Sequence, residues 1–317
     1  MRISCEVFLA VADMGSITKA AQRLHVTQQC ASDHIKRLER EYGVLLFERK
    51  PKFKMTEAGE VLLEGLRNLK FMELNVKRNM LELSKGMKGS FSLGISTSRA
   101  PLILPGVLSK YYQEYPNVNI SFSEEDTQIL EEQLTDGKVD LFIGVNTTPN
   151  PVYRVDTIVT EKILLVISQG LMNKHFSQQE IKQIKKGIDL SCCTDIPFTL
   201  SLNTGKVTHV ILEYLNSNNI KLNVVYNVSD SRTQTQICST GICAALCPEM
   251  LLDAVYEHNR TCGGQNYLLT IPVKNLENDL RIDLVTREGA LYPKYMQYFI
   301  QTIKAELPMI ARKNVLA

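Results

Sequence analysis

The side chains best suited to specific chemistry, here hydrogen bonding to bases and phosphates, form a polar face on the segment 28–41. Ala31, Ile35 and Leu38 recur in it at spacings of four and three, which predicts a helix with one apolar stripe. On the other face, glutamine amides can bond adenine edges, an aspartate can accept from a cytosine amino group, and cations suit phosphates. This face consists of Gln28, Gln29, Ser32, Asp33, Lys36, Arg37 and Arg40, with Thr27 as the expected helix cap.

A second basic cluster follows in the segment 45–56. Two short extended pieces flank a turn that contains Pro51, which predicts a β-hairpin wing. The cations expected to face a nucleic-acid backbone are Arg49, Lys50, Lys52 and Lys54. Taken singly such charges are usually only solvated, but solvation does not explain why they gather on one helix face and one turn.

Two shorter helices must position the polar helix. Residues 3–13 carry apolar side chains on one face, and Gly15 ends this helix. Ser16 or Thr18 can cap a second helix over residues 19–24. A short helix, a tight turn and a polar-faced helix form the arrangement that places a recognition helix in the major groove.

The segment 57–85 contains no proline and predicts one long helix. Its apolar residues fall on four- and three-residue steps, the pattern of a helix that pairs with a copy of itself. The alternative is a helix that packs against its own domain. The predicted seam consists of Leu62, Leu66, Leu69, Val76, Met80 and Leu83.

Beyond residue 90 the chain alternates between strand and helix patterns. The first module has expected strands at 91–95, 117–123 and 139–145 and expected helices at 102–115 and 129–136. This βαβαβ order predicts a parallel sheet with helices on both faces. A second α/β module is expected over about residues 162–269, after which the chain returns to the first.

Two hydroxyl-rich turns, 96–99 and 201–205, follow strands in the two modules and precede helices. In open α/β sheets ligands bind beyond such strand ends, and helix starts offer amide donors that suit an anion. The simpler alternative is that serine and threonine only cap the helices. The candidate ligand-binding residues are Ser96, Thr97, Ser98, Arg99, Ser201, Asn203 and Thr204.

Catalytic and metal-binding patterns are weak in this sequence. Five histidines are scattered, and no glycine-rich phosphate loop, nucleophile elbow or marked acid pair occurs. The eight cysteines form no paired zinc pattern. Cys238, Cys243 and Cys247 are expected to be buried structural thiols, and Cys192-Cys193 to be the more exposed pair. We therefore expect no enzymatic activity, no cofactor and no metal.

Composition divides the 317 residues into two electrostatic parts. Residues 1–90 hold 16 Lys+Arg against 11 Asp+Glu, a net +5, and residues 91–317 hold 20 against 23, a net −3. A basic front on a mildly acidic body indicates a nucleic-acid reader joined to another module. No uncharged apolar run reaches 18 residues, and Glu6 interrupts the N-terminal stretch. We therefore expect no membrane segment, no export signal and a cytoplasmic protein.

Many positions in register carry a family resemblance. In the first sixty residues they are Phe8, Val11, Gly15-Ser16-Ile17-Thr18, Ala20-Ala21, Leu24, Thr27-Gln28, Ser32, Ile35, Leu38-Glu39, Gly43, Leu46-Phe47, Arg49 and Thr56-Glu57-Ala58-Gly59. Later motifs are Leu104-Pro105, Tyr115-Pro116-Asn117-Val118, Val139-Asp140-Leu141 and the segment 241–248. Over essentially the whole chain the sequence resembles LysR-type transcriptional regulators. The family usually has proline where this chain has Gln29, which we interpret as a changed operator preference.

The resemblance implies an α+β multidomain fold. Its expected parts are a winged helix-turn-helix DNA-binding domain (1–58), a linker and dimerisation helix (59–88) and a two-lobed, periplasmic-binding-protein-like α/β effector domain (90–317). Lobe one is expected over about 90–161 and 270–317, and lobe two over about 162–269. The implied function is sequence-specific transcription regulation, modulated by a small anionic or polar effector bound between the lobes. The implied partners are double-stranded DNA, further copies in a homodimer or homotetramer, and RNA polymerase.

An alternative from another class is a solute-binding or enzymatic α/β domain with an accessory DNA-binding module. It would account for residues 91–317, but it gives no reason for the basic helix-turn-helix.

Overall fold

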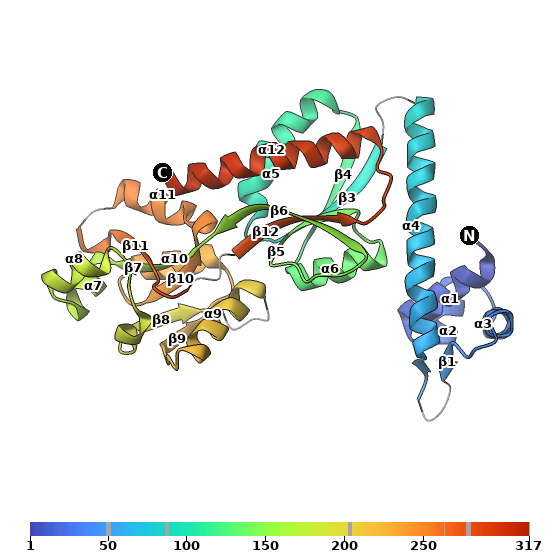
Figure 1. The fold of residues 1–317 in the computed structure, drawn as a ribbon, viewed down its shortest axis with the longest axis horizontal. Helices are drawn as coiled ribbons and strands as arrows, with labels where there is room; N and C mark the ends of the chain where they lie inside the picture. Colours follow the sequence, from blue (N-terminus) through green and yellow to red (C-terminus); the bar gives the residue numbers. More distant parts are fainter. Residues whose placement is uncertain (49–51, 86–88, 202–204, 263, 277–279, 317) are drawn as a thin grey trace. The chain divides into compact units, whose positions relative to one another are not determined.

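The computed structural model describes residues 1–48, 52–85, 89–201, 205–262, 264–276 and 280–316 (Figure 1). The chain divides into an N-terminal unit, essentially residues 1–86, and a C-terminal unit, essentially residues 87–317. Among the described residues, no helix combines the length and apolar character needed to cross a bilayer.

The N-terminal unit is a winged helix-turn-helix, as predicted. Its elements are α1 (Ile3–Met14), α2 (Ile17–Arg23), α3 (Gln28–Tyr42), β1 (Phe47–Glu48), β2 (Lys54–Met55) and α4 (Glu57–Lys85). Gly15 and Gly43 end α1 and α3 with φ of 58° and 71°, values at which a side chain would be strained. The hydroxyls of Ser16 and Thr27 accept N–H bonds in the first turns of α2 and α3. Strands β1 and β2 pair antiparallel as the wing.

The hydrophobic core of this unit lies between the three short helices and the start of α4. Ala31, Ile35 and Leu38 are fully buried, so the predicted stripe of α3 does face inward. Leu66 of α4 is also buried in this core, and Leu62 packs against it. These two residues therefore correct the predicted seam, because they follow the alternative of packing against their own domain.

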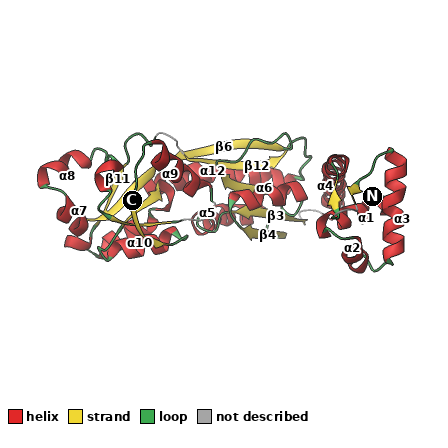
Figure 2. Ribbon diagram, turned by 90° about the horizontal axis from the view of Figure 1, so that it is seen from below, coloured by secondary structure: helices red, strands yellow, loops and turns green. Residues whose placement is uncertain are grey.

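The C-terminal unit has two lobes, each built on a five-stranded sheet. Lobe one contains β3 (Gly89–Ile95), α5 (Ala100–Glu114), β4 (Val118–Glu124), α6 (Thr127–Asp136), β5 (Leu141–Val145), β6 (Tyr153–Glu161), β12 (Leu280–Arg287) and α12 (Lys294–Leu316). Its strand order is β4-β3-β5-β12-β6. Strands β3, β4 and β5 are parallel as predicted, whereas β12 runs antiparallel between β5 and β6. Figure 2 shows β6 and β12 side by side.

Lobe two has the strand order β11-β7-β10-β8-β9. Its elements are β7 (Ile163–Ser168), α7 (Gln169–His175), α8 (Gln178–Ile184), η1 (Leu190–Cys193), β8 (Pro197–Leu200), α9 (Lys206–Ser217), β9 (Asn223–Asn227), α10 (Ser231–Ser239), β10 (Ala244–Pro248), η2 (Glu249–Leu251), α11 (Asp253–Thr261), η3 (Gly264–Asn266) and β11 (Leu268–Pro272). The chain enters this lobe between β6 and β7 and leaves it between β11 and β12. The predicted two-lobed architecture is confirmed.

The last helix contains a proline in its interior. Pro308 lacks the backbone N–H that a helix interior uses, and such a residue often ends a helix. In the structure α12 continues through Pro308 to Leu316. Pro308 leaves the carbonyl of Lys304 without its usual helical donor, and Lys304 lies on the exposed side where water can solvate that carbonyl.

Candidate DNA-contacting surface and ligand cavity

The exposed face of α3 carries the predicted base-contacting side chains. Gln28 and Gln29 are exposed in its first turn, and Ser32 is partly exposed one turn later. Asp33 and Lys36 are exposed and form an ion pair at 3.9 Å. A pair so exposed is weak, so either partner can exchange it for a contact with DNA.

The predicted phosphate-contacting cations lie on the same helix and on the wing. Arg37 and Arg40 are exposed on α3, and Nε of Arg40 donates to the carbonyl of Lys36 at 3.3 Å. On the wing, Lys52 and Lys54 are exposed. The predicted contacts Arg49 and Lys50 lie outside the described residues.

An apolar stripe remains exposed along α4. Leu69, Val76 and Met80 of the predicted seam are each more than half exposed, and so is Met72, which the sequence reasoning missed. The steps of three and four residues from Leu69 to Met80 place them on one side of the helix. The side chain of Leu83 lies outside the described part of the chain.

A cavity with an empty volume of about 690 Å³, part of it open to solvent, lies between the two lobes. Lobe one contributes the turn before α5, the start of α6 and Val145, and lobe two contributes the end of β8, the start of α9 and residues around α10 and β10. The polar lining residues are Ser96, Ser98, Arg99, Asp126, Thr127, Ser201, Lys206, Thr208, Ser229, Ser231 and Gln234. Hydroxyls predominate, so the cavity suits a small polar ligand.

The structure brings part of the predicted ligand set together. Ser96, Ser98 and Ser201 line the cavity, whereas Thr97 is exposed and does not. Ser96 is 9% exposed, and its Oγ has no hydrogen-bond partner among the described residues. A buried hydroxyl without a partner is costly, so a ligand that bonds it would gain affinity. Asn203 and Thr204 lie outside the described residues.

The first turn of α5 offers fewer amides than a free helix start. The N–H groups of Arg99 and Ala100 both donate to the carbonyl of Ser96, and Pro101 has no N–H. The turn before α5 therefore presents hydroxyls rather than these amides to the cavity. Arg99 lines the cavity, but its guanidinium pairs with Glu161 and both side chains are almost fully buried. Its charge is thus neutralised inside the fold.

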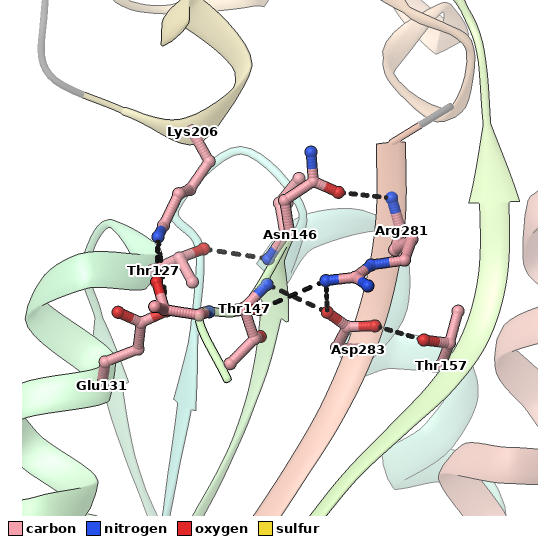
Figure 3. A network of polar contacts seen from close by, with 10 residues as sticks. Thr127, Glu131, Asn146, Thr147, Thr157, Lys206, Arg281 and Asp283 are labelled. Carbon is pink, nitrogen blue, oxygen red and sulfur yellow. Dashed lines mark hydrogen bonds and ion pairs between the residues drawn. The ribbon is translucent and has the colours of Figure 1, made fainter. Parts of the chain in front are cut away.

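Lys206 is the cationic residue that the sequence reasoning missed (Figure 3). It is the first residue of α9 in lobe two, and its Nζ donates to Oγ1 of Thr148 in lobe one at 2.7 Å. The same Nζ lies 3.4 Å from Oε1 of Glu131 on α6. Glu131 also accepts the N–H of Thr148 at 2.7 Å. These contacts join the two lobes beside the cavity.

A buried carboxylate fixes the loop that carries Thr148. Asp283 on β12 is fully buried and accepts the N–H of Thr147 at 3.0 Å and the hydroxyl of Thr157 at 2.7 Å. Arg281 lies 3.7 Å from this carboxylate and donates to the carbonyl of Thr147 (Figure 3). A fully bonded buried carboxylate is rigid, so it holds the lobe-one side of the contact in place.

Two family models match this chain. The one described as "LysR substrate binding domain" matches residues 84–308, and the one described as "Bacterial regulatory helix-turn-helix protein, lysR family" matches residues 4–60. The chain belongs to the LysR family.

Relatives of this LysR-family chain are named as transcriptional regulators and not as enzymes. One is the regulator YcgK of Bacillus subtilis, 25% identical over 76% of this chain and 78% of the relative. Another is the transcriptional activator CmpR of Synechocystis, 26% identical over 75% of each chain. The protein is accordingly a LysR-family transcriptional regulator with an effector-binding domain.

Solved structures agree with this fold. Full-length CbnR complexed with its target DNA has a TM-score of 0.54 at 19% identity, covering 95% of this chain and 98% of CbnR. A mutant of OxyR from Corynebacterium glutamicum has a TM-score of 0.58 at 23% identity, covering 98% of this chain and 92% of OxyR. LysR regulators bind DNA and effectors and form oligomers, and this chain shares their architecture.

The thiols of this LysR-family regulator are free and mostly buried. Cys192 is exposed, but its neighbour Cys193 is buried, and burial raises the pKa of Cys193 to about 12. Burial also raises the pKa of Cys247. Among the described residues, no group of three histidine, cysteine or acidic side chains could hold a metal ion.

Proposed function

We propose that this regulator reads its operator through α3 and the wing, and that a small anionic or polar effector between the lobes modulates the binding. The observation that carries the effector proposal is the cavity lined from both lobes, with the unpartnered hydroxyl of Ser96 in its wall. A ligand that contacts both lobes favours the relative orientation of the lobes to which it binds more tightly. The size of this shift is set by the difference between its affinities for the two orientations.

The DNA-binding part of the proposal assigns roles by position and chemistry. Gln28, Gln29, Ser32 and Asp33 lie at the N-terminal half of α3, the part of a recognition helix that contacts base edges. Lys36, Arg37, Arg40 and the cations of the wing suit phosphates, which supply affinity without sequence preference.

The oligomeric part of the proposal rests on α4. Its exposed stripe of Leu69, Met72, Val76 and Met80 favours pairing with the same helix of a second copy. We propose that α4 forms the interface of a homodimer. If the effector domains also pair, the assembly would be a homotetramer. The regulator would act in the cytoplasm, with RNA polymerase as a further partner.

The test begins with the DNA upstream of the regulator's own gene in a gel-shift assay. Full-length protein should shift it, and deletion of residues 1–58 should abolish the shift. Metabolites that change the shift in a screen are then titrated by calorimetry against Ser98→Ala and Ser201→Ala, with Ser109→Ala on the exposed side of α5 as the control.

We expect both cavity variants to lose the response to the metabolite, because they remove hydroxyls from its binding site, and the control to keep it. If both cavity variants bind the metabolite as the wild type does, the pocket lies elsewhere and this assignment is wrong.

A further inference from the structure

We propose that Lys206 recognises the anionic group of the effector, and that Glu131 occupies Lys206 when no effector is bound. The effector would then displace Glu131 and release a contact that joins the lobes. This inference rests on the proposed effector site and adds to it the residue that selects charge.

Lys206 of lobe two points toward Glu131 of lobe one (Figure 3), and Lys206 also lines the cavity. Its Nζ reaches from the start of α9 to Oγ1 of Thr148 at 2.7 Å and to Oε1 of Glu131 at 3.4 Å. The side chain of Lys206 is 24% exposed and that of Glu131 is 13% exposed. Both are therefore enclosed enough for the charge to matter and open enough for a ligand to reach.

Lys206 is the only cation of the described cavity lining whose charge a ligand can take over. The lining contains one other cation, Arg99, which is paired with Glu161 at 3% and 4% exposure. Breaking that pair would strand a carboxylate without water, which is strongly unfavourable. A ligand anion therefore finds its accessible positive partner at Lys206.

Glu131 can give up Lys206 at low cost. Its Oε1 accepts the N–H of Thr148 at 2.7 Å, a shorter contact than the 3.4 Å to Lys206. This backbone bond remains when Lys206 leaves, so the carboxylate is not stranded. The exchange replaces the partly solvated ion pair between Lys206 and Glu131 by one between Lys206 and the effector. The free energies of the two pairs are similar, so the exchange is close to balanced.

The exchange would move the connection between the lobes. Without ligand, Lys206 joins lobe two to α6 and the loop at Thr148. A ligand that bonds both Lys206 and the hydroxyls of Ser96 or Ser98 joins lobe two to the start of α5 instead. Because the two attachment points lie in different segments of lobe one, we expect the lobes to rotate relative to each other.

The experiment measures the distance between the lobes in the full-length protein. Spin labels are attached through unnatural amino acids that replace Gln113 in lobe one and Gln179 in lobe two, both of which are exposed. This chemistry avoids the eight native cysteines, which would otherwise also be labelled. The probes are acetate and inorganic phosphate, with neutral acetamide as the reference. The variants are Lys206→Met and Glu131→Gln.

Matched controls come from a pair outside the cavity lining. Nζ of Lys304 on α12 lies 2.6 Å from Asp156 on β6, both in lobe one. Lys304→Met removes a positive charge, as Lys206→Met does, and Asp156→Asn removes a negative charge, as Glu131→Gln does. We expect both controls to match the wild type in distance and in response.

We expect the wild type to shift its distance distribution with the anions but not with acetamide. Glu131→Gln should shift at an anion concentration several-fold lower, because the internal competitor is gone. Lys206→Met should already have a changed distribution and lose at least tenfold in sensitivity to anions.

Three results would overturn the inference: no response of the wild type to either anion, an equal response of Lys206→Met, or unchanged distances in both variants. Gel shifts on the same samples separate the two proposals. If the protein still binds the operator but the distances between the labels do not change as expected, only the role of Lys206 is wrong. If operator binding is also absent, the proposed function is wrong as well.

Discussion

Arg99 and Glu161 form a buried ion pair where the two lobes of the effector domain join. The side chains are 3% and 4% exposed, and the second carboxylate oxygen of Glu161 accepts the N–H of Met250 at 2.7 Å. Arg99 precedes α5, Glu161 ends β6 and Met250 belongs to η2, so one carboxylate connects both lobes. The pair lies beside the cavity and stiffens this junction of the two lobes.

Replacing Arg99 by methionine should destabilise the effector domain strongly. The substitution keeps most of the side-chain volume but leaves Glu161 as an uncompensated buried charge, which costs about 3–5 kcal/mol. Urea unfolding followed by circular dichroism measures the loss. The double variant Arg99→Met with Glu161→Gln should recover part of it, because no charge is then stranded.

The control for this prediction is an exposed pair in lobe two. Arg232 lies 3.0 Å from Asp253, with side chains 53% and 26% exposed. Arg232→Met should cost at most about 1 kcal/mol. If Arg99→Met costs no more than this control, the burial of the pair has no energetic consequence and the stiffening role is wrong.

The adjacent thiols Cys192 and Cys193 should differ in reactivity. Burial raises the pKa of Cys193 to about 12, so at pH 8 about one molecule in ten thousand carries its thiolate, the form that reacts. Cys192 is exposed. Iodoacetamide at pH 8 followed by peptide mass spectrometry should find Cys192 alkylated and Cys193 unmodified in the folded protein. Equal labelling would contradict the burial of Cys193.

The same pKa shift makes stability depend on pH in the alkaline range. Cys193 holds its proton more tightly when folded, since its pKa rises from 9.0 to about 12. Its contribution to stability is therefore complete below pH 9 and is lost as the pH rises from 9 towards 12. Comparing urea midpoints of wild type and Cys193→Ser across this window should show a smaller alkaline decline in the variant.

The sequence predicted those elements whose local signals agree with one another. Helix α3 has an apolar stripe and a threonine cap, and both have the expected role in the structure. Strand β6 was missed although it contains Val155 and Val159. Its C-terminal end at Glu161 is polar, and no turn residues there mark where the strand stops. Leu62 and Leu66 were misassigned because a heptad pattern does not reveal which partner covers it.

The candidate site was harder to predict because its charges are paired across the fold. Arg99 precedes its partner by 62 residues and Lys206 follows Glu131 by 75, so neither pair produces a local pattern. Serine turns could be found, since strand ends and helix starts are local features. Which cation remains accessible to a ligand depends on tertiary contacts that spacing does not encode.

Dimerisation should depend on the exposed stripe of α4. Replacing both Leu69 and Val76 by glutamate places like charges at two levels of a helix that pairs with its own copy. Both positions are more than half exposed, so the fold itself should tolerate the change. Analytical ultracentrifugation should find monomers or a much weaker dimer. Met309→Glu, on the exposed side of α12, should leave the assembly unchanged, and a persistent dimer in the double variant would move the interface elsewhere.

Operator recognition should separate into a sequence-reading part on α3 and a sequence-independent part on the wing. Gln29 is exposed in the first turn of α3, where its amide can bond a base edge bidentately. Gln29→Ala should therefore cost about 1–3 kcal/mol on the best operator and relax the preference at one position. Lys52 on the wing suits a phosphate, so Lys52→Ala should weaken all operators alike and reduce the salt slope by about 1.

Fluorescence anisotropy with a set of single-base operator variants, measured at several salt concentrations, tests both substitutions together. The two variants serve as each other's control, because one should change the ranking of operators and the other should change only the common affinity. If Gln29→Ala ranks every operator as the wild type does, α3 does not read bases through this residue and the proposed docking is wrong. If Lys52→Ala alters the ranking, the wing reads sequence and the division of roles must be reversed.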